Sequence, residues 1–333
     1  MKPRTTADVL DLLGSHIASA ALAAALELRL FWMLEEQPQT VDGVAQAIGI
    51  PSNRCLYWLE LLTEMGLLQR RSGAYSPSSK ARTAILEVYS PETWELLAQE
   101  ARERYPAGTD LALHIRQSGS VWAAQGMRAP DYVAQMMESL ARARRFTRML
   151  YEIPRPLAEE LAGALDMTGV QRLMDLGGGS GVVSLALLRR HPDLTAVVVD
   201  IANVCTAGRE IAADTPVAGR ITYHAADFLC DELPSGFDMV LECDVGIYSE
   251  ALFRKLRAAL NPHGRLVIVD KLARPGLALS LPCLSHAFQA SLENPDFTIP
   301  TVAELQADLV RAGFQPVSEE VLPGGEVVLQ AHK

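Results

Sequence analysis

The stretch Gln171–Asp200, QRLMDLGGGSGVVSLALLRRHPDLTAVVVD, decides the fold. It predicts a strand at Leu173–Leu176, a glycine turn, a helix over Val182–Arg190 and a second strand at Thr195–Val199. Two parallel strands joined by a helix form a right-handed unit, and ligands bind at the carboxyl ends of such strands. We therefore expect an α/β protein with its ligand at the strand tips.

The spacing of the glycine turn indicates which ligand binds there. Gly177 and Gly179 belong to a G-x-G-x-G turn, and Val182 stands where a dinucleotide-binding turn has its third glycine. Asp175 precedes the turn, and an acid at this place would repel a pyrophosphate and attract an ammonium group. S-adenosylmethionine (SAM) has that ammonium and no phosphate, so we predict it as the cofactor. The alternative is a structural glycine turn in another α/β enzyme.

Acids at the next two strand tips extend this cofactor site. Asp200, followed by Ile201, ends the second strand, where its carboxylate can accept hydrogen bonds from a ribose diol. Asp227 and Phe228 follow the third strand, so the carboxylate can accept a hydrogen bond from an adenine amino group while the phenyl ring covers the base. All four residues are predicted to bind SAM.

The rest of this region predicts more strands and a closing hairpin. Further strands are expected at Phe237–Glu242 and Arg265–Asp270, with a helix from Ser249 to Leu260 between them. At the end, Phe314–Ser318 is expected to pair with Glu326–Gln330. Dinucleotide-binding oxidoreductases usually lack an antiparallel hairpin at the edge of their parallel sheet, so the hairpin supports the prediction of SAM independently of the glycines.

Taken together, these motifs resemble a known family. LMDLGGGSG, VVVDIANV, AADF, FDMVLE, LRAALNPHGRLVIVDK and AGFQPV are similar to class I SAM-dependent methyltransferases, and more narrowly to the O-methyltransferase family with an N-terminal dimerisation domain. The resemblance implies a Rossmann-like, seven-stranded sheet in an α/β domain over residues 166–333. It also implies a winged-helix dimerisation domain over 1–100, and a helical connector over 101–165 that lines the acceptor pocket. The implied protein is a homodimer that methylates a small molecule, a secondary metabolite.

The resemblance also suggests residues around the methyl acceptor. Met136 or Met137 of the connector would line the acceptor pocket, although ordinary helix packing is the simpler explanation for either methionine taken singly. Glu242 and Cys243 are expected to flank the methyl end of the cofactor, and Tyr248 is a candidate for placing the acceptor.

The general base is where the chain departs from the family. The family has His-Asp-Trp a few residues after the fourth strand, whereas this chain reads ECDVGIYSE over 242–250, without histidine. One interpretation makes His286 the base, together with Asp244. A second is an amine, thiol or carbon acceptor placed by Asp244 or Tyr248, and a third is a protein that binds SAM without transferring methyl groups. Asp244 and His286 alone are too few ligands to predict a metal.

A winged helix-turn-helix pattern over 40–76 raises a rival interpretation, a DNA-binding regulator that binds SAM. Its second helix offers only Arg54 for reading bases and carries Glu60 and Glu64 in a chain with a net charge of −10. Phosphate contacts would be scarce, so we expect a structural module and no nucleic-acid partner.

Composition suggests where the protein works. The 333 residues, 49% of them hydrophobic, suffice for two domains. The five cysteines form no C-x-x-C pair, which favours reduced thiols in the cytoplasm. Charges at Asp8, Asp11, Glu27 and Arg29 interrupt the first apolar segment, so neither a signal peptide nor a membrane span is expected. That apolar segment, Ala7–Leu34, is expected to pack against a second copy of the chain.

Overall fold

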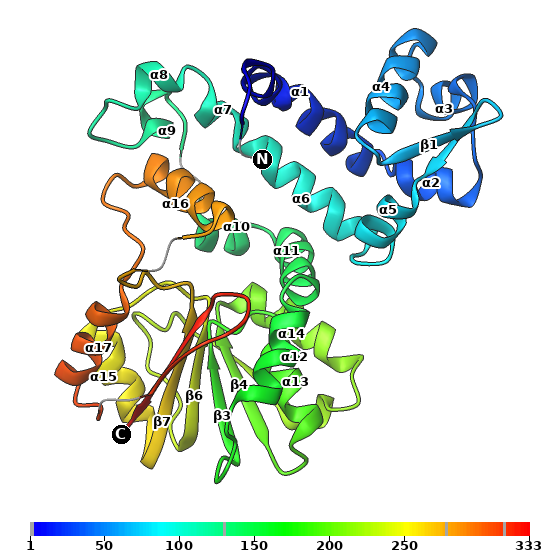
Figure 1. Cartoon of the computed structure of the whole chain (residues 1–333). Coiled ribbons are helices and arrows are strands. Elements are labelled where there is room, and N and C mark those ends of the chain that lie inside the picture. Colours follow the sequence, from blue (N-terminus) through cyan, green and yellow to red (C-terminus); the bar gives the residue numbers. More distant parts are fainter. Residues whose placement is uncertain (1–2, 129–130, 277–278, 316–317) are drawn as a thin grey trace. The chain divides into compact units, whose positions relative to one another are not determined.

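The computed structural model describes residues 3–128, 131–276, 279–315 and 318–333. It divides into two compact units, Met1–Thr109 and Asp110–Lys333, which contain the helices and strands labelled in Figure 1. The expected division into three segments, with a connector over 101–165, stays a prediction.

The first unit is mainly helical. Its elements are α1 (Thr6–Glu27), α2 (Leu30–Glu36), α3 (Val41–Ile48), α4 (Ser52–Glu64), β1 (Leu68–Arg71), β2 (Ala74–Pro77), α5 (Ser79–Ala81), the π-helical turn η1 (Arg82–Leu86), α6 (Pro91–Glu103) and α7 (Tyr105–Gly108). Two short helices followed by the antiparallel β1–β2 hairpin form the expected winged helix. Its core includes the fully buried Phe31, Leu59 and Tyr75.

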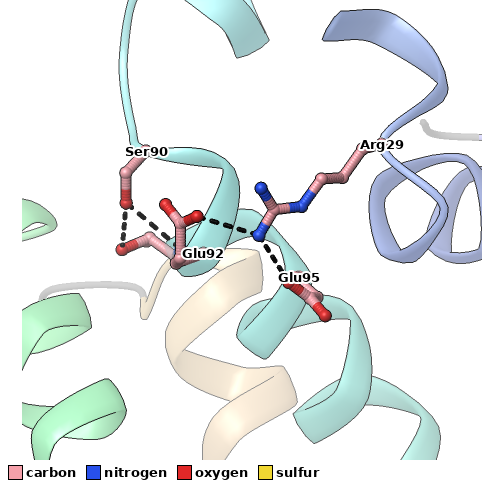
Figure 2. Close-up of polar contacts among 5 residues, drawn as sticks. Arg29, Ser90, Glu92 and Glu95 are labelled. Carbon is pink, nitrogen blue, oxygen red and sulfur yellow. Dashed lines mark hydrogen bonds and ion pairs between the residues drawn. The ribbon is translucent and has the colours of Figure 1, made fainter. Parts of the chain in front are cut away.

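Polar contacts join the bend between α1 and α2 to α6. Arg29 lies at this bend in the left-handed region, with φ 54°. Figure 2 shows its guanidinium donating to Glu92, at 2.8 Å, and to Glu95, at 3.3 Å. Ser90 caps α6 by accepting a hydrogen bond from the backbone N–H of Thr93. Exposed ion pairs add little stability each, so they mainly fix where α6 lies along the bend.

The face of α1 outside the core of the unit is apolar. Its large apolar residues Val9, Leu10, Leu12, Leu13 and Ile17 are all exposed. By length and composition alone, α1 is the one described helix apolar enough to cross a membrane, a property that it shares with core helices of soluble proteins and with signal sequences. The charges do not prevent this because Asp8, Asp11 and Glu27 lie near the ends of the helix and Arg29 lies beyond it. The same face also suits a contact with a second protein chain.

The second unit is a seven-stranded sheet covered by helices. Its elements are α8 (Leu111–His114), α9 (Val121–Ala124), α10 (Tyr132–Glu138), α11 (Leu140–Glu152), α12 (Arg155–Ala164), β3 (Arg172–Leu176), α13 (Val182–Arg190), β4 (Thr195–Asp200), α14 (Ala202–Ala213), η2 (Ala218–Arg220), β5 (Ile221–Ala225), β6 (Phe237–Cys243), α15 (Glu250–Ala259), β7 (Leu260–Asp270), α16 (Leu281–Glu293), α17 (Val302–Arg311), β8 (Glu319–Val321) and β9 (Val327–His332).

The strand order confirms the predicted fold class. The sheet runs β5-β4-β3-β6-β7-β9-β8, with the first five strands parallel and β9 antiparallel to both of its neighbours. Figure 1 shows α15 and α17 lying on the opposite side of the sheet from α12 and α13. Alternating side chains serve the two faces: Leu173 packs in the core beneath α12 and α13, and Met174 in the core beneath α15.

Two strand boundaries differ from the prediction. The edge hairpin turns near Leu322 as expected, but its first strand is β8, and of the predicted Phe314–Ser318 only Gln315 forms an isolated bridge, to His332. Pro316 and Val317 lie outside the described residues. The fifth parallel strand begins early, at Leu260 and not at Arg265, because residues 261–264 are absorbed into the strand as an irregularity opposite Phe237–Met239.

Candidate functional site

The tip of β4 is hydrogen-bonded to the glycine turn. Gly179 donates its backbone N–H to Asp200 Oδ2 at 3.0 Å, and Ile201 donates to Oδ1 at 2.7 Å. Asp200 is only 6% exposed, and burial raises the pKa of its carboxyl to about 6. Each carboxylate oxygen has a second lone pair, so the group that shapes the turn can still accept hydrogen bonds from a diol.

Asp175 lies beneath the same turn. It is 2% exposed, and Ser184 of α13 donates its hydroxyl to Asp175 Oδ2 at 2.7 Å. A Cβ on Gly178 would come within 2.4 Å of the Asp175 carboxyl carbon, so the backbone crosses directly over this acid. Burial raises the pKa of Asp175 to about 6. The structure places the carboxylate of Asp175 under the turn. A contact between this carboxylate and the ammonium group of SAM stays a prediction.

The two outer glycines give the turn its shape. Gly177 and Gly179 have φ 63° and 55°, in the left-handed region that side chains disfavour. The backbone N–H of Gly177 donates to the Val199 carbonyl at 2.8 Å, which ties the turn to the end of β4. These glycines therefore expose backbone at the point where a cofactor would approach.

The segment after β5 presents Asp227 at the surface. Asp227 is exposed, and its Oδ1 accepts the backbone N–H of Leu229 at 2.9 Å, which orients the carboxylate. Phe228 is half-buried against the core, and Lys255 of α15 donates to its carbonyl at 2.9 Å. Sequence reasoning missed Lys255, since only the fold brings α15 to this loop.

Glu242 is the most unusual group in the site. It pairs in the sheet with Leu176 and Ile268, is 0% exposed, and neither of its carboxyl oxygens has a hydrogen-bond partner among the described residues. Burial, and then the nearby Asp270, hold its pKa well above the ordinary value. Cys243 follows, half-buried, with its thiol pKa raised by burial. Both predicted residues thus lie at the carboxyl end of β6.

The loop after β6 lies against the glycine turn. Asp244 turns the chain with φ 56° and donates its backbone N–H to the Val269 carbonyl at 2.9 Å. A Cβ on Gly177 would meet a methyl of Val245 at 2.9 Å, so the loop and the turn are in contact. The hydroxyl of Tyr248 donates to Asp270 at the end of β7, so this candidate for placing an acceptor is already bonded.

His286 and Asp244 are brought within electrostatic range. His286 lies exposed on α16, with its ring edge-on to Phe297 at 6.4 Å between centroids. The pKa of Asp244 is raised, first by desolvation and then by Asp270, while Lys271 and His286 oppose the rise. The two predicted catalytic residues thus share one end of the sheet.

The connector methionines have different surroundings. Met136 is fully buried against Val204 and Ile201, whereas Met137 is exposed. Asn203 of α14 donates to both of their carbonyls, at 2.9 and 3.1 Å, which holds α10 beside the tip of β4. Tyr132, which the sequence did not single out, packs against Phe146 with the two rings tilted by 58° and their centroids 5.5 Å apart. The pKa of Tyr132 is raised by burial and by Asp200.

Among the described residues, no group of three or more histidine, cysteine or acidic side chains is placed to hold a metal ion.

Comparison with known sequences identifies the family of this chain. The profile of the O-methyltransferase domain matches residues 110–287, and that of the O-methyltransferase dimerisation domain matches residues 10–86. A 3-hydroxy-5-methyl-1-naphthoate 3-O-methyltransferase of Streptomyces sahachiroi is 31% identical over 79% of this chain and 76% of its own length. The N,N-dimethyltransferase OxyT of Streptomyces rimosus is 28% identical over 92% of this chain and 90% of its own.

Solved structures show the same fold. The crystal structure of human N-acetylserotonin methyltransferase in complex with SAM aligns over 100% of this chain and 99% of its own, with a TM-score of 0.80 and 19% identity. At that identity the likeness concerns the fold alone.

Proposed function

The chain belongs to the O-methyltransferase family and is a SAM-dependent methyltransferase, and on that basis we propose that it methylates a small secondary metabolite at the carboxyl end of its sheet. The observation that carries the location is the hydrogen bond from Gly179 to Asp200. It joins the turn that would face the methionine part of the cofactor to the acid that would hold the ribose.

The residues fit SAM in a simple division of roles. Asp200 would accept hydrogen bonds from the ribose hydroxyls, and Asp227 and Phe228 would bind the adenine. Gly177 and Gly179 would expose their backbone toward the methionine part of the cofactor. Asp175 supports an ammonium group from beneath the turn through its negative charge. Glu242 and Cys243 would flank the methyl end. When bound, SAM supplies an electrophilic methyl group on a positively charged sulfur.

The chain's part in the reaction is to orient the acceptor and remove its proton. His286 is proposed as the base for a hydroxyl acceptor, because a neutral imidazole nitrogen can accept the hydroxyl proton. The carboxylate of Asp244 lies within electrostatic range and would stabilise the imidazolium that forms. Contact between Val245 and Gly177 keeps this loop against the cofactor turn.

The family does not fix which atom is methylated, because relatives of this chain include O-, N- and C-methyltransferases. We favour oxygen, on the family match. The rival idea of a SAM-binding regulator has less support, since matches to the methyltransferase domain and to enzymes cover both units.

We further propose a cytoplasmic homodimer that forms through the first unit. The match to the dimerisation domain and the exposed apolar residues of α1 support this proposal.

Calorimetry tests the proposed function. SAM and S-adenosylhomocysteine should bind with micromolar affinity, and NAD should not bind. Incubation of the protein and SAM with phenolic or amine-bearing polyketides should release S-adenosylhomocysteine. Tight NAD binding without SAM binding would overturn the proposal.

A further inference from the structure

The acceptor end of the site has an excess of carboxyl groups. Cys243 of β6 pairs with Val269 of β7, so the residues that follow them, Asp244 and Asp270, leave neighbouring parallel strands side by side. Glu242 lies one residue before Cys243 on the same strand, opposite Ile268. Three acids thus gather where two strands end.

The donors and cations around these acids do not balance them. Tyr248 donates its hydroxyl to one carboxylate oxygen of Asp270, and Lys271 donates its backbone N–H to the other. The Lys271 ammonium is largely exposed and lies 3.9 Å from a fourth acid, Glu326. His286 is exposed on α16. Of the described residues named at this end, four are acids and two carry basic side chains.

Glu242 supplies the independent sign of a ligand. A fully buried carboxyl group without any donor costs folding free energy that a hydrogen bond would recover. Glu242 is in that state, with both oxygens unpaired among the described residues, and Glu242, Ile268 and Asp270 lie on the same face of the sheet. Its side chain therefore lies on the same face of the sheet as Asp270, which raises its pKa, and no described residue donates a hydrogen bond to it.

From the proposed function we infer that the acceptor carries a basic nitrogen, which binds as an ammonium group among Glu242, Asp244 and Asp270. An ammonium group brings three donors and a positive charge, whereas a phenolate or a carboxylate brings acceptors and a negative charge. The same acids would repel an anionic acceptor. The inference concerns the group that anchors the acceptor and is compatible with methylation at oxygen or at nitrogen.

The test uses three probes of nearly equal shape and different charge: tyramine, 4-ethylphenol and 4-hydroxyphenylacetate. Each is titrated into the full-length protein saturated with S-adenosylhomocysteine, so that the cofactor's own ammonium is already in place. We expect tyramine to bind at least about tenfold more tightly than 4-ethylphenol, and 4-hydroxyphenylacetate to bind more weakly than either. Tyramine binding no tighter than 4-ethylphenol binding, including no binding of either probe, overturns the inference.

Variants locate the effect. Asp270→Asn and Glu242→Gln should each reduce the preference for tyramine several-fold, while Asp193→Asn, in an exposed turn before β4, should leave it unchanged. The affinity for S-adenosylhomocysteine, measured on the same samples, separates the two proposals. If Glu242→Gln weakens the cofactor and leaves the tyramine preference intact, the partner of Glu242 is the cofactor's ammonium and the inference fails.

Discussion

Gly179 and Asp200 are joined by a 3.0 Å hydrogen bond that links the glycine turn after β3 to the tip of β4. The carboxylate also accepts the backbone N–H of Ile201, so one acid shapes the turn and ends the strand. The geometry of a cofactor site at this edge therefore depends on Asp200 even before a ligand arrives.

Asp200→Ala should weaken SAM binding by about a hundredfold, because it removes the predicted ribose contacts and loosens the turn. Calorimetry measures the change. Asp214→Ala, an exposed acid at the end of α14, is the matched control and should bind like the wild type. Unchanged affinity in Asp200→Ala would reject the ribose assignment.

The affinity for SAM should rise as the pH increases from 5 to 7. Burial raises the pKa of both Asp175 and Asp200 from 3.8 to about 6, and an ammonium group and a diol favour the ionised acids. Asp175→Asn should reduce the pH dependence, because one titrating group is gone. Titrations at three pH values check this, and a flat profile in the wild type would contradict it.

The free energy of unfolding of the ligand-free protein should fall as the pH rises, whereas the affinity for SAM rises. The carboxyl groups of Asp175 and Asp200 keep their protons up to about pH 6 in the folded state, because burial raises their pKa, but lose them near pH 3.8 in the unfolded chain. The contribution of each group to the free energy of unfolding is therefore fully present below pH 3.8. That contribution is lost as the pH rises through about 6, a change on the order of 3 kcal/mol per carboxyl. Urea unfolding with and without Asp175→Asn measures the part that belongs to Asp175.

His286→Ala should lower turnover by about a hundredfold with SAM affinity unchanged, if the imidazole takes the acceptor's proton. Gln289→Ala, an exposed change in the same helix, controls for damage to α16. A rate close to that of the wild type would move the role to Asp244 or to no base.

Tyr248→Phe should destabilise the second unit by about 1–2 kcal/mol, because Asp270 loses its hydroxyl donor. The loop before α15 would also lose a tether, so the KM for the acceptor should rise more than kcat falls. Urea unfolding and steady-state kinetics measure both effects. Tyr57→Phe, at an exposed tyrosine of α4, should change neither quantity.

The paired changes Leu13→Asp and Ile17→Asp should convert a dimer into a monomer, since both side chains are exposed on the apolar face of α1. Light scattering coupled to size exclusion reports the mass. Ser15→Asp, also exposed on α1, tests the effect of a charge alone. A monomeric wild type, or one that floats with liposomes, would contradict the dimer proposal.

The sequence predicted the sheet well because its signals are local. Apolar runs such as Thr195–Val199 and the helical period of Val182–Arg190 lead directly to β4 and α13. The exposure of the apolar face of α1 could not be predicted in the same way, because it depends on which side of the helix packs on the rest of the unit.

The site was less accessible to sequence reasoning, since its chemistry depends on packing between distant segments. The bond from Ser184 to Asp175, the unpaired oxygens of Glu242 and the pairing of Tyr248 with Asp270 all arise from the fold. A sequence places an acid at a strand tip, but it does not tell which oxygen already has a partner.

The most direct test is a crystal structure with S-adenosylhomocysteine bound. The account predicts that the ribose lies on Asp200, the adenine on Asp227 and Phe228, and the sulfur near Glu242 and Cys243. A ligand bound elsewhere, with the crevice at Asp200 empty, would contradict it.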